Sequence, residues 1–412
     1  MQPFFEIIRE VIFYLRQYKS RTFMTMFGII WGTVTVILLL AFGTGLSRKL
    51  MIDMHGLGEG IAIVWPGRTS MAYQGYSRER GVRLREEDVN LIRQKVPGLA
   101  YISPEYSMWN LPVRYGEKLN KPNISGIIPE YGLMRNIWPQ AGGRWLNDID
   151  LEKRRRVVFL GNRLKDYLFG EESDPVGRYV HIGDTPFQVV GVLVPKTQDS
   201  SYRQRDRDRA FIPASTFVSL YGYRYVSNLI YQHADPHQAK ANEAQVYSVL
   251  GQKYKWHPED KEALWIWDTC ESEKFMRDFG ASFNLFLGII GSISLLIGGI
   301  GLANIMYVIV QERTREIGIR RSVGAKQWHI MRHFFLEAFL IIGFSALVGF
   351  VLAALLIRLI NSFPIQEYVG SPVLSVTVAA VTVIVLGLIG FLAGFFPARK
   401  ASRLDPVECL RY

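Results

Sequence analysis

The sequence predicts an α-helical membrane protein with four transmembrane helices and a large α+β extracytoplasmic domain between helices 1 and 2. Four apolar runs are long enough to cross a bilayer core, which takes about 20 residues of helix. Basic residues gather beside these runs on one side only, as they do in short cytoplasmic loops. The segment between the first two runs is long enough to fold as one or two domains.

The apolar runs and their flanks set the expected boundaries. The four spans are residues 23–46, 285–310, 334–360 and 373–396. Lys and Arg enrich the first and last segments and the loop between spans two and three, but are absent from the last loop. Both termini are therefore expected in the cytoplasm. The expected cytoplasmic segments are 1–22 (an amphipathic helix), 311–333 and 397–412, and the extracytoplasmic ones are 47–284 and 361–372.

The net charge of +11 follows this topology, because much of the basic excess lies beside the apolar runs. No nucleic-acid-binding motif accompanies the charge, so nucleic acid is not an expected partner. The first run exceeds the h-region of a cleaved signal peptide and is expected to stay as an anchor. Cys270 and Cys409 then fall on opposite sides of the membrane, and no intrachain disulfide is expected.

The segment between the first two spans has alternating strand and helix signals. Their order, with strand–helix–strand patterns on both flanks of a mostly β centre, predicts two α+β subdomains, one inserted in the other. Residues 202–209 (YRQRDRDR) alternate in charge and are interpreted as an exposed loop. A helix from residue 271 is expected to continue into the second span as a stalk. Strands are expected at 61–64, 157–160, 179–182, 187–194, 210–213, 227–232 and 264–267, and helices at 85–95, 162–169 and 236–252.

The loop over residues 311–333 is the most informative stretch. Topology requires only positive charge there, but apolar residues are interleaved with the arginines, which indicates a partner surface. An amphipathic helix lying on lipid headgroups is the alternative. The candidate coupling residues are Glu312, Arg313, Arg315, Glu316, Ile317, Ile319, Arg320, Arg321, Val323 and Lys326.

Small residues four positions apart occur in three of the spans. Such pairs allow helix backbones to approach closely in lipid, within the chain or in a subunit interface. Glycine is also common in membrane spans for other reasons. The pairs are Gly28 and Gly32, Gly288 and Ser292, Ser294 and Gly298, and Gly390 and Gly394.

Signatures of catalysis are missing from the sequence. There is no G-x-x-x-x-G-K-[ST] loop, so ATP hydrolysis by that route is not expected, and there is no G-x-S-x-G elbow. The pairs His329/His333 and His233/His237 are interpreted as interfacial or surface histidines, and no metal or cofactor is expected. Glu337 is the exceptional carboxylate of the spans, near the cytoplasmic edge with His333 one turn before it, and is expected in an ion pair.

Several motifs together resemble the MacB/FtsX-like superfamily of ABC transporter permeases. ERTREIGIRRSVGA (312–325) is similar to the signature that follows the family's second span, and PARKASRLDPVECLRY (397–412) to its terminal pattern. GIIPEYGLMRN, GGRWL, VVFLGNRLKDYLFG, DPVGRYVHIGDTPFQVVGVL and FIPAST resemble the periplasmic core in family order.

The resemblance implies a dimeric permease in the bacterial inner membrane, with a second copy or a paralogue as its other subunit. It implies an ABC ATPase, which holds ATP and Mg²⁺, docked on the cytoplasmic side; a separate ATPase subunit is expected because the sequence has no phosphate-binding loop. The interleaved apolar and basic residues of 312–327 are the expected docking segment. Motion of that ATPase would be transmitted to the extracytoplasmic domain for export or extraction of a substrate; some members also use a periplasmic adaptor and an outer-membrane channel. The alternatives are an FtsX-like regulator of an extracytoplasmic hydrolase or sensor, and a membrane-anchored binding protein without an ATPase, for which one span would suffice.

Overall fold

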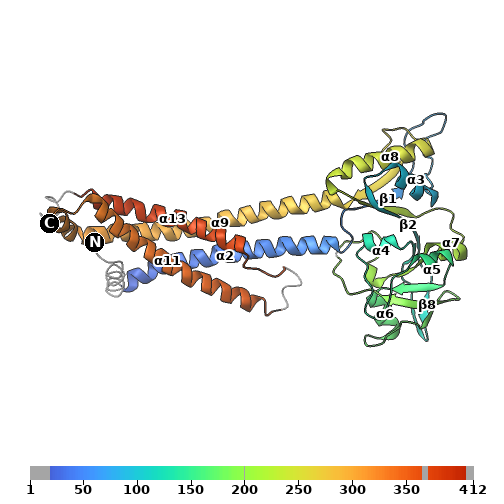
Figure 1. Ribbon diagram of the computed structural model, residues 1–412, viewed down its shortest axis with the longest axis horizontal. Coiled ribbons are helices and arrows are strands. Elements are labelled where there is room, and N and C mark those ends of the chain that lie inside the picture. The colour runs from blue at the N-terminus through green and yellow to red at the C-terminus, as the bar shows by residue number, and fades with distance from the viewer. Residues whose placement is uncertain (1–18, 199, 364–369, 405–412) are drawn as a thin grey trace. The chain divides into compact units, whose positions relative to one another are not determined.

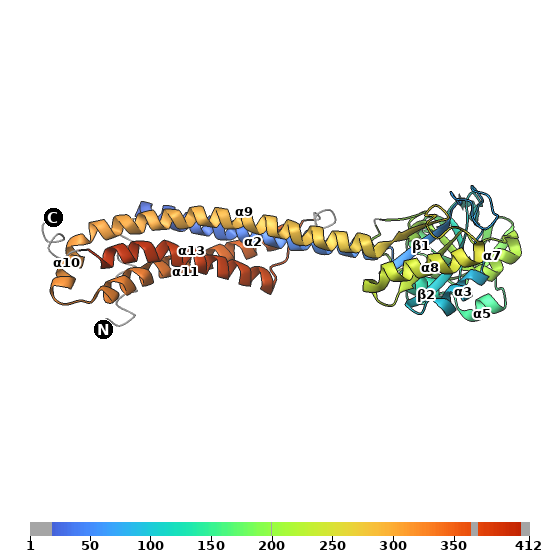
Figure 2. The same ribbon diagram turned by 90° about the horizontal axis from the view of Figure 1, so that it is seen from above.

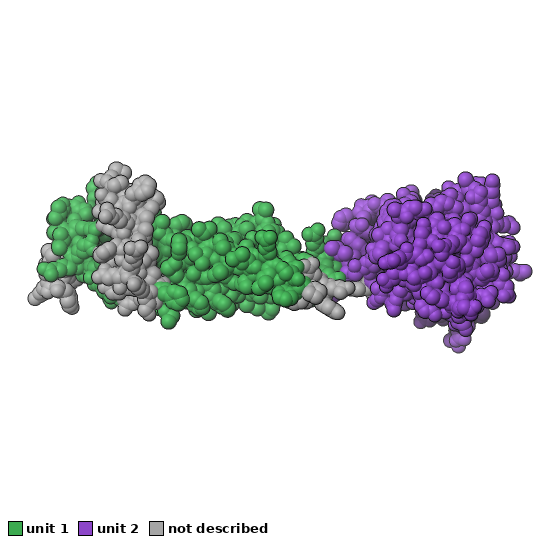
Figure 3. All heavy atoms as spheres, turned by 90° about the horizontal axis from the view of Figure 1, so that it is seen from below, with its two compact units in different colours: residues 1–49, 277–412 green, residues 50–276 purple. Residues whose placement is uncertain are grey.

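The computed structural model describes residues 19–198, 200–363 and 370–404, and the chain divides into two compact units (Figure 3). Residues 1–49 and 277–412 form what we call the helical unit, and residues 50–276 form the sheet unit. The amphipathic helix expected over residues 1–22 lies largely outside the described residues, as does Cys409.

Among the described residues, four helices are long and apolar enough to cross a membrane, as the sequence predicts. Each overlaps the run from which it was predicted, and α9 is one uninterrupted helix through the expected stalk and the second span. A short helix, α10, follows it. The bounds are α2 (Lys19–His55), α9 (Thr269–Glu312), α10 (Thr314–Ser322), α11 (Gln327–Ile360) and α13 (Val376–Ser402).

Glycines bring α2 and α9 together in the helical unit, where the two helices run side by side (Figures 1 and 2). A Cβ built on Gly298 would lie 2.7 Å from the carbonyl oxygen of Gly28, and one on Gly32 would lie 2.9 Å from the Cα of Leu295. Both distances are shorter than real side chains allow, so the two backbones meet closely only because these positions lack side chains. Trp31, between the two α2 glycines, is 62% exposed and points away from this contact.

The other small residues have different neighbours. Gly390 and Gly394 of α13 face α11, where added Cβ atoms would lie 2.8 Å from Ile342 and 3.0 Å from Ala338. Gly288 faces Leu40 more loosely, at 3.6 Å. The hydroxyls of Ser292 and Ser294 donate to carbonyls of their own helix, those of Gly288 and Ile290.

The described part of the sheet unit forms eleven strands in one sheet, in the order β11-β1-β10-β2-β5-β9-β6-β8-β7-β3-β4. The strands β11, β1 and β10, which come from the two ends of the unit's sequence, lie at one end of the sheet, and β3 to β9 lie on the other side of β2. The division into two subdomains stays a prediction. The elements are β1 (Ile61–Pro66), α3 (Glu87–Lys95), β2 (Leu99–Met108), β3 (Val113–Tyr115), β4 (Lys118–Asn120), β5 (Ile124–Ile127), α4 (Glu130–Met134), α5 (Asp148–Glu152), β6 (Val157–Leu160), α6 (Asn162–Phe169), β7 (Tyr179–Ile182), β8 (Thr185–Val192), η1 (Asp206–Asp208), β9 (Ala210–Pro213), α7 (Ala214–Tyr221), β10 (Asn228–His233), η2 (Pro236–Gln238), α8 (Ala239–Tyr254) and β11 (Leu264–Asp268).

Alternating side chains give the sheet two apolar faces. In β1, Ala62 and Val64 join one core cluster, whereas Ile61 and Ile63 join another. The first cluster includes residues of α3, α6, α7 and α8, so these helices cover one face. The second includes Tyr131 and Met134 at α4, which lies on the opposite face.

The sequence-based strands and helices recur in the structure with small shifts, and the main omission is β2. This ten-residue strand contains Pro104 and Glu105, which are uncommon in central strands and mask the strand pattern. The strand is nevertheless held between β10 and β5.

The close contact between Gly298 and Gly28 predicts the effect of adding a side chain at position 298. An alanine normally stabilises a helix relative to glycine by about 1 kcal/mol. We expect Gly298→Ala to lower the midpoint of thermal unfolding instead, because its Cβ collides with the backbone of Gly28. Gly301→Ala, in the same helix with nothing within 4 Å of an added Cβ, is the control and should leave the midpoint unchanged or raised. Equal behaviour of the two variants in detergent would contradict the close contact.

Candidate functional site

The segment between α9 and α11 is anchored to the helical unit by an ion pair. Arg313, just before α10, directs both terminal nitrogens at Glu337 of α11, with N–O distances of 3.3 and 3.5 Å. The two side chains are only 10% and 4% exposed. A two-pronged guanidinium–carboxylate contact of this kind fixes orientation as well as position. The carboxylate singled out in the third span therefore has Arg313 as an ion-pair partner.

Two further contacts hold α10 in place. Nη1 of Arg321 donates to the carbonyl oxygens of Ser402 (3.1 Å) and Leu404 (2.9 Å), beyond the apolar part of α13. Ile317 is 3% exposed and belongs to the apolar core of the helical unit. Ile317 and Arg321 thus face their own chain, and Ile317 is too buried to be an exposed partner contact, whereas the coupling role of the half-buried Arg321 stays a prediction.

The opposite side of α10 is exposed. Ile319 is 49% and Val323 84% exposed, and Arg315 and Lys326 are also at the surface. Glu316 and Arg320 form an ion pair one turn apart. Gly324, at φ +101°, ends the segment with a backbone conformation that favours glycine. We call the set Arg315, Ile319, Arg320, Val323 and Lys326, of which Arg320 is only partly exposed, the α10 face.

A groove of about 640 Å³ adjoins the α10 face. Ile319 lines it from α10, Val323 from just beyond the end of α10, and His329 and His333 from the start of α11. Glu312, the remaining predicted coupling residue, ends α9 and is exposed. The groove combines apolar and basic side chains, as a protein-binding surface does.

The sheet unit contains a second polar centre, a network of buried charges on the α4 face. Arg209, before β9, bonds to Glu105 of β2 and lies 3.4 Å from Asp206. Arg135 contacts Asp206 with distances of 2.7 and 3.0 Å, and Lys196 lies 2.8 Å from it. The carboxylates of Glu105 and Asp206 and the guanidinium groups of Arg135 and Arg209 are fully buried. Breaking such a pair typically costs about 3–5 kcal/mol.

The pairing sets the protonation of both carboxylates. Burial alone would raise the pKa of Glu105, but the charge of Arg209 and hydrogen bonds from Tyr202 and Asn228 outweigh it and lower the pKa to about 2. The pKa of Asp206 is likewise lowered, because Arg135 and Lys196 outweigh its burial.

The network overturns the exposed-loop interpretation of residues 202–209. Tyr202 donates to Glu105 at 2.6 Å, and Asp206 and Arg209 are fully buried. Alternating charge usually indicates solvent, but here the partners lie far away in sequence, on β2 and beyond α4. Only the contacts between these distant segments distinguish a buried charged segment from an exposed loop.

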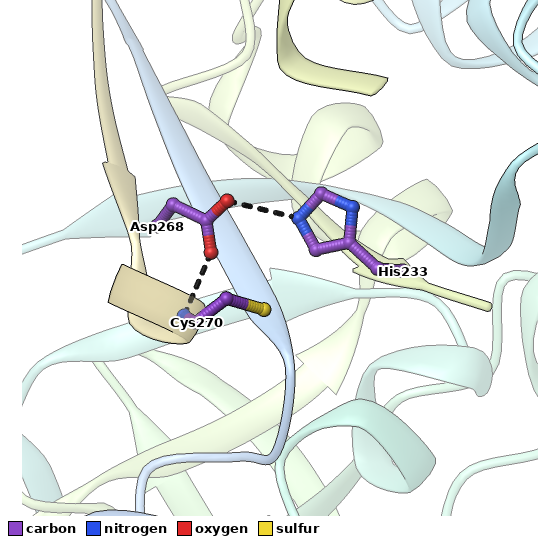
Figure 4. Close-up of side chains that lie close together, drawn as sticks. All are labelled: His233, Asp268 and Cys270. Atoms are coloured by element: carbon purple, nitrogen blue, oxygen red, sulfur yellow. Dashed lines mark hydrogen bonds and ion pairs between the residues drawn. The ribbon is translucent and has the colours of Figure 1, made fainter. Parts of the chain in front are cut away.

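A third polar group lies where the sheet unit's last strand meets α9 (Figure 4). His233, Asp268 and Cys270 are the described residues whose ligand atoms lie close enough together to hold a metal ion. Nε2 of His233 lies 3.1 Å from Asp268, and Asn242 lies 3.1 Å from Nδ1. The side-chain nitrogen of Asn242 donates to the carbonyl oxygen of Gly98, which identifies it as the NH₂ group. The same group therefore donates to Nδ1 of His233, so Nδ1 is the acceptor and the ring proton lies on Nε2.

Hydrogen bonds among these groups account for their close approach. The Nε2 proton points at Asp268, and burial followed by the charge of Asp268 raises the pKa of Cys270 to about 12, so the thiol is protonated. The backbone N–H of Cys270 also donates to Asp268 at 2.8 Å. We interpret the group as a hydrogen-bonded joint that ties β10 and β11 to the first turn of α9. His237, the other histidine of that pair, lies apart in η2.

Comparison with known proteins decides the family. The model described as MacB-like periplasmic core domain matches residues 22–248, and the one described as FtsX-like permease C-terminal matches residues 288–406. This chain belongs to the MacB/FtsX-like family of ABC transporter permeases. Together with its four apolar helices, membership makes this MacB-like chain a multi-pass protein of the inner membrane.

Named relatives align over most of this MacB-like chain. "Macrolide export ATP-binding/permease protein MacB" of Rhodospirillum rubrum is 32% identical over 399 residues, covering 96% of this chain and 58% of the relative. "Pyoverdine export ATP-binding/permease protein PvdT" of Pseudomonas syringae pv. syringae is 33% identical over 398 residues, covering 95% and 57%. The chain therefore spans less than two thirds of the length of these relatives.

Solved structures resemble the chain more distantly. The periplasmic region of MacB from Actinobacillus actinomycetemcomitans is 19% identical, with a TM-score of 0.43, over 56% of this chain and 98% of that structure. The extracellular domain of the noncanonic ABC-type transporter YknZ from Gram-positive bacteria is 20% identical, with a TM-score of 0.41, over 50% and 99%.

The buried network predicts an acid transition. The folded-state pKa of Glu105 lies below its ordinary value of 4.5, so its contribution to the free energy of unfolding is present above pH 4.5 and is lost as pH falls towards about 2. Tryptophan fluorescence during denaturation reports mainly on the sheet unit, which holds seven of the nine tryptophans. Glu105→Gln should destabilise the unit near neutral pH and flatten this acid dependence.

The exposed Glu117→Gln variant is the control and should keep the wild-type pH profile. A Glu105→Gln profile parallel to wild type between about pH 2 and pH 4.5 would contradict the assigned role of Glu105.

Proposed function

We propose that this chain is the permease subunit of an ABC transporter, with a separate ATPase docked on the α10 face. The observation behind the proposal is the two-sided character of α10. Arg313, Arg321 and Ile317 attach one side to the helical unit, whereas the other side presents Val323 at 84% exposure beside a groove. A rigid attachment and an exposed apolar contact are what a force-transmitting docking element requires.

A protein partner suits this face better than lipid headgroups. Headgroups would select basic side chains around a continuous apolar stripe. Here the groove is lined by the nearly buried side chains of Ile317, Ile330 and Phe334 as well as by the exposed Ile319 and Val323, so the apolar surface is a recess and not a continuous exposed stripe. The relatives named MacB and PvdT are called ATP-binding/permease proteins, whereas residues 1–412 of this chain contain no phosphate-binding loop.

Motion of the docked ATPase would pass along α9. This helix is continuous from Thr269, next to the sheet unit's last strand, to Glu312, next to α10. Its first turn is fixed to the sheet unit, because Thr269 accepts the N–H of Ile61 at 3.0 Å and Glu273 accepts that of Gly60 at 3.1 Å. Both ends of the helix are therefore attached to elements that would move with it.

Export, or extraction from the outer side of the membrane, is the work we assign to this motion. The relatives are named for macrolide and pyoverdine export, and the scarcity of ionisable groups in the spans does not suit a polar pathway through them. A second permease copy or a paralogue would complete the transporter. A periplasmic adaptor and an outer-membrane channel are further proposed partners.

The proposal includes a topology with the α10 face in the cytoplasm and the sheet unit outside. After Cys270→Ser and Cys409→Ser, a cysteine placed at Lys121 should react with a membrane-impermeant maleimide in cells whose outer membrane has been permeabilised. A cysteine at Lys326 should react only after the inner membrane is lysed. Both positions are exposed, so accessibility to the reagent decides the result. The reverse pattern would refute the topology.

The docking surface predicts a loss of the ATPase. Val323→Asp should reduce the ATPase co-purified with the chain by about tenfold or more, because burial of an aliphatic side chain contributes about 1.5–3 kcal/mol. Arg315→Glu/Lys326→Glu should also reduce recovery of the ATPase, most strongly at low salt, because salt screens interactions between exposed charges. The bound ATPase is identified by the peptide that contains its phosphate-binding loop.

Val323→Leu is the matched control, because it keeps an apolar side chain at the same exposed site. It should retain the ATPase at wild-type levels, with all variants inserted in the membrane in equal amounts. If both Val323→Asp and the charge-reversal variant retain the ATPase, the proposal that it docks on the α10 face is wrong.

A further inference from the structure

The strand β11 ends the sheet without an outer neighbour. It pairs antiparallel with β1, and among the described residues it pairs with no other strand. Its five residues, LWIWD, contain no Lys and no Pro, and the pairing with β1 has no bulge. Natural edge strands are usually protected by such features. The outer edge of β11 is therefore a ready template for another strand.

A groove of about 880 Å³ runs between this edge and α8. Ala244, Ser248 and Gly251 line it from α8 at positions four and three residues apart, on one helix face. The short side chains of Ala244 and Ser248 leave space along the helix, whereas Gly251 is buried against Trp256 and Tyr247 also lines this wall. The groove therefore has one wall that offers backbone hydrogen bonds and one that leaves room for side chains.

Aromatic side chains and charges are distributed along the groove. Trp265 of β11 is 67% exposed and stacks on Trp65 at 4.7 Å. Lys255 and Lys261 line the groove in the connection that precedes β11. Glu243 and Glu271, the latter 3.1 Å from Lys240, line it around the far end of the strand.

We propose that this groove binds an extended segment of a partner polypeptide, which adds to the sheet as a strand antiparallel to β11. Antiparallel pairing is the somewhat more stable arrangement. It places the C-terminal end of the segment beside Lys255 and Lys261, and its N-terminal end beside Glu243 and Glu271. The preferred segment therefore carries an acidic residue or a free carboxylate at its C-terminal end and a basic residue at its N-terminal end.

The chemistry of the two walls selects a peptide over other occupants. A row of backbone donors and acceptors is matched by another extended backbone, and recognition at a strand edge beside a helix is a known mode of peptide binding. A lipid chain would require an apolar groove, but this one is lined by lysines and glutamates. The proposal concerns the sheet unit and does not depend on the ATPase-docking face.

The test uses the full-length chain in lipid nanodiscs and a random-peptide library displayed on phage. An enriched peptide is synthesised in its native form and with alternate backbone amides N-methylated. We expect the native peptide to bind and to slow hydrogen exchange at residues 264–268, and the methylated form to bind at least about tenfold more weakly. Ser248→Trp, which fills the groove from an exposed position, should weaken binding similarly.

Charge-reversal variants test the orientation. Lys255→Glu/Lys261→Glu should weaken a peptide with an acidic C-terminal end, whereas Lys121→Glu/Lys153→Glu, at exposed sites outside the groove, should not. Equal binding of the N-methylated peptide would overturn strand addition, as would the absence of any enriched peptide. Cross-linking of introduced cysteines between β11 strands of two chains would instead assign the edge to a second copy and overturn the proposal.

Discussion

The ion pair between Arg313 and Glu337 is the interaction on which the proposed coupling depends. It lies between the end of α9 and the first turns of α11, with both side chains nearly buried. Because a buried charge that loses its partner is costly, the two helices cannot separate there without a large penalty. Arg321 adds a second attachment beside α13. A force applied to α10 would therefore act on three long helices together, not on a flexible loop.

Paired buried charges also hold the sheet unit together. Its buried carboxylates, Glu105 and Asp206, are surrounded by guanidinium, ammonium and hydroxyl groups, which together outweigh the cost of burial. These contacts connect β2, α4 and the chain before β9, segments far apart in sequence. Apolar packing alone would leave that chain segment free to move. The network therefore fixes which segments pack against one another, in addition to stabilising the interior of the unit.

The joint at His233, Asp268 and Cys270 links this rigid interior to α9. Asp268 accepts hydrogen bonds from the imidazole of His233 and from the N–H of Cys270, at the point where strand becomes helix. The same strand, β11, offers its outer edge to the groove beside α8. A partner bound at that edge would lie directly next to the start of α9. A partner bound there and an ATPase docked on the α10 face, both of them proposals, would then act on one continuous helix.

The sequence alone determined the membrane class, because a bilayer core demands long apolar helices and basic loops mark their ends. It also indicated most strands and helices, since hydrophobic periodicity is local. It could not distinguish Ile317, which is buried in the helical core, from Val323, which is exposed, because both are aliphatic residues in one short basic segment. Nor could it reveal that Asp206 and Arg209 are interior, or that β11 lies at the edge. Those facts depend on which distant segments meet, and burial, pairing and edges arise only from such contacts.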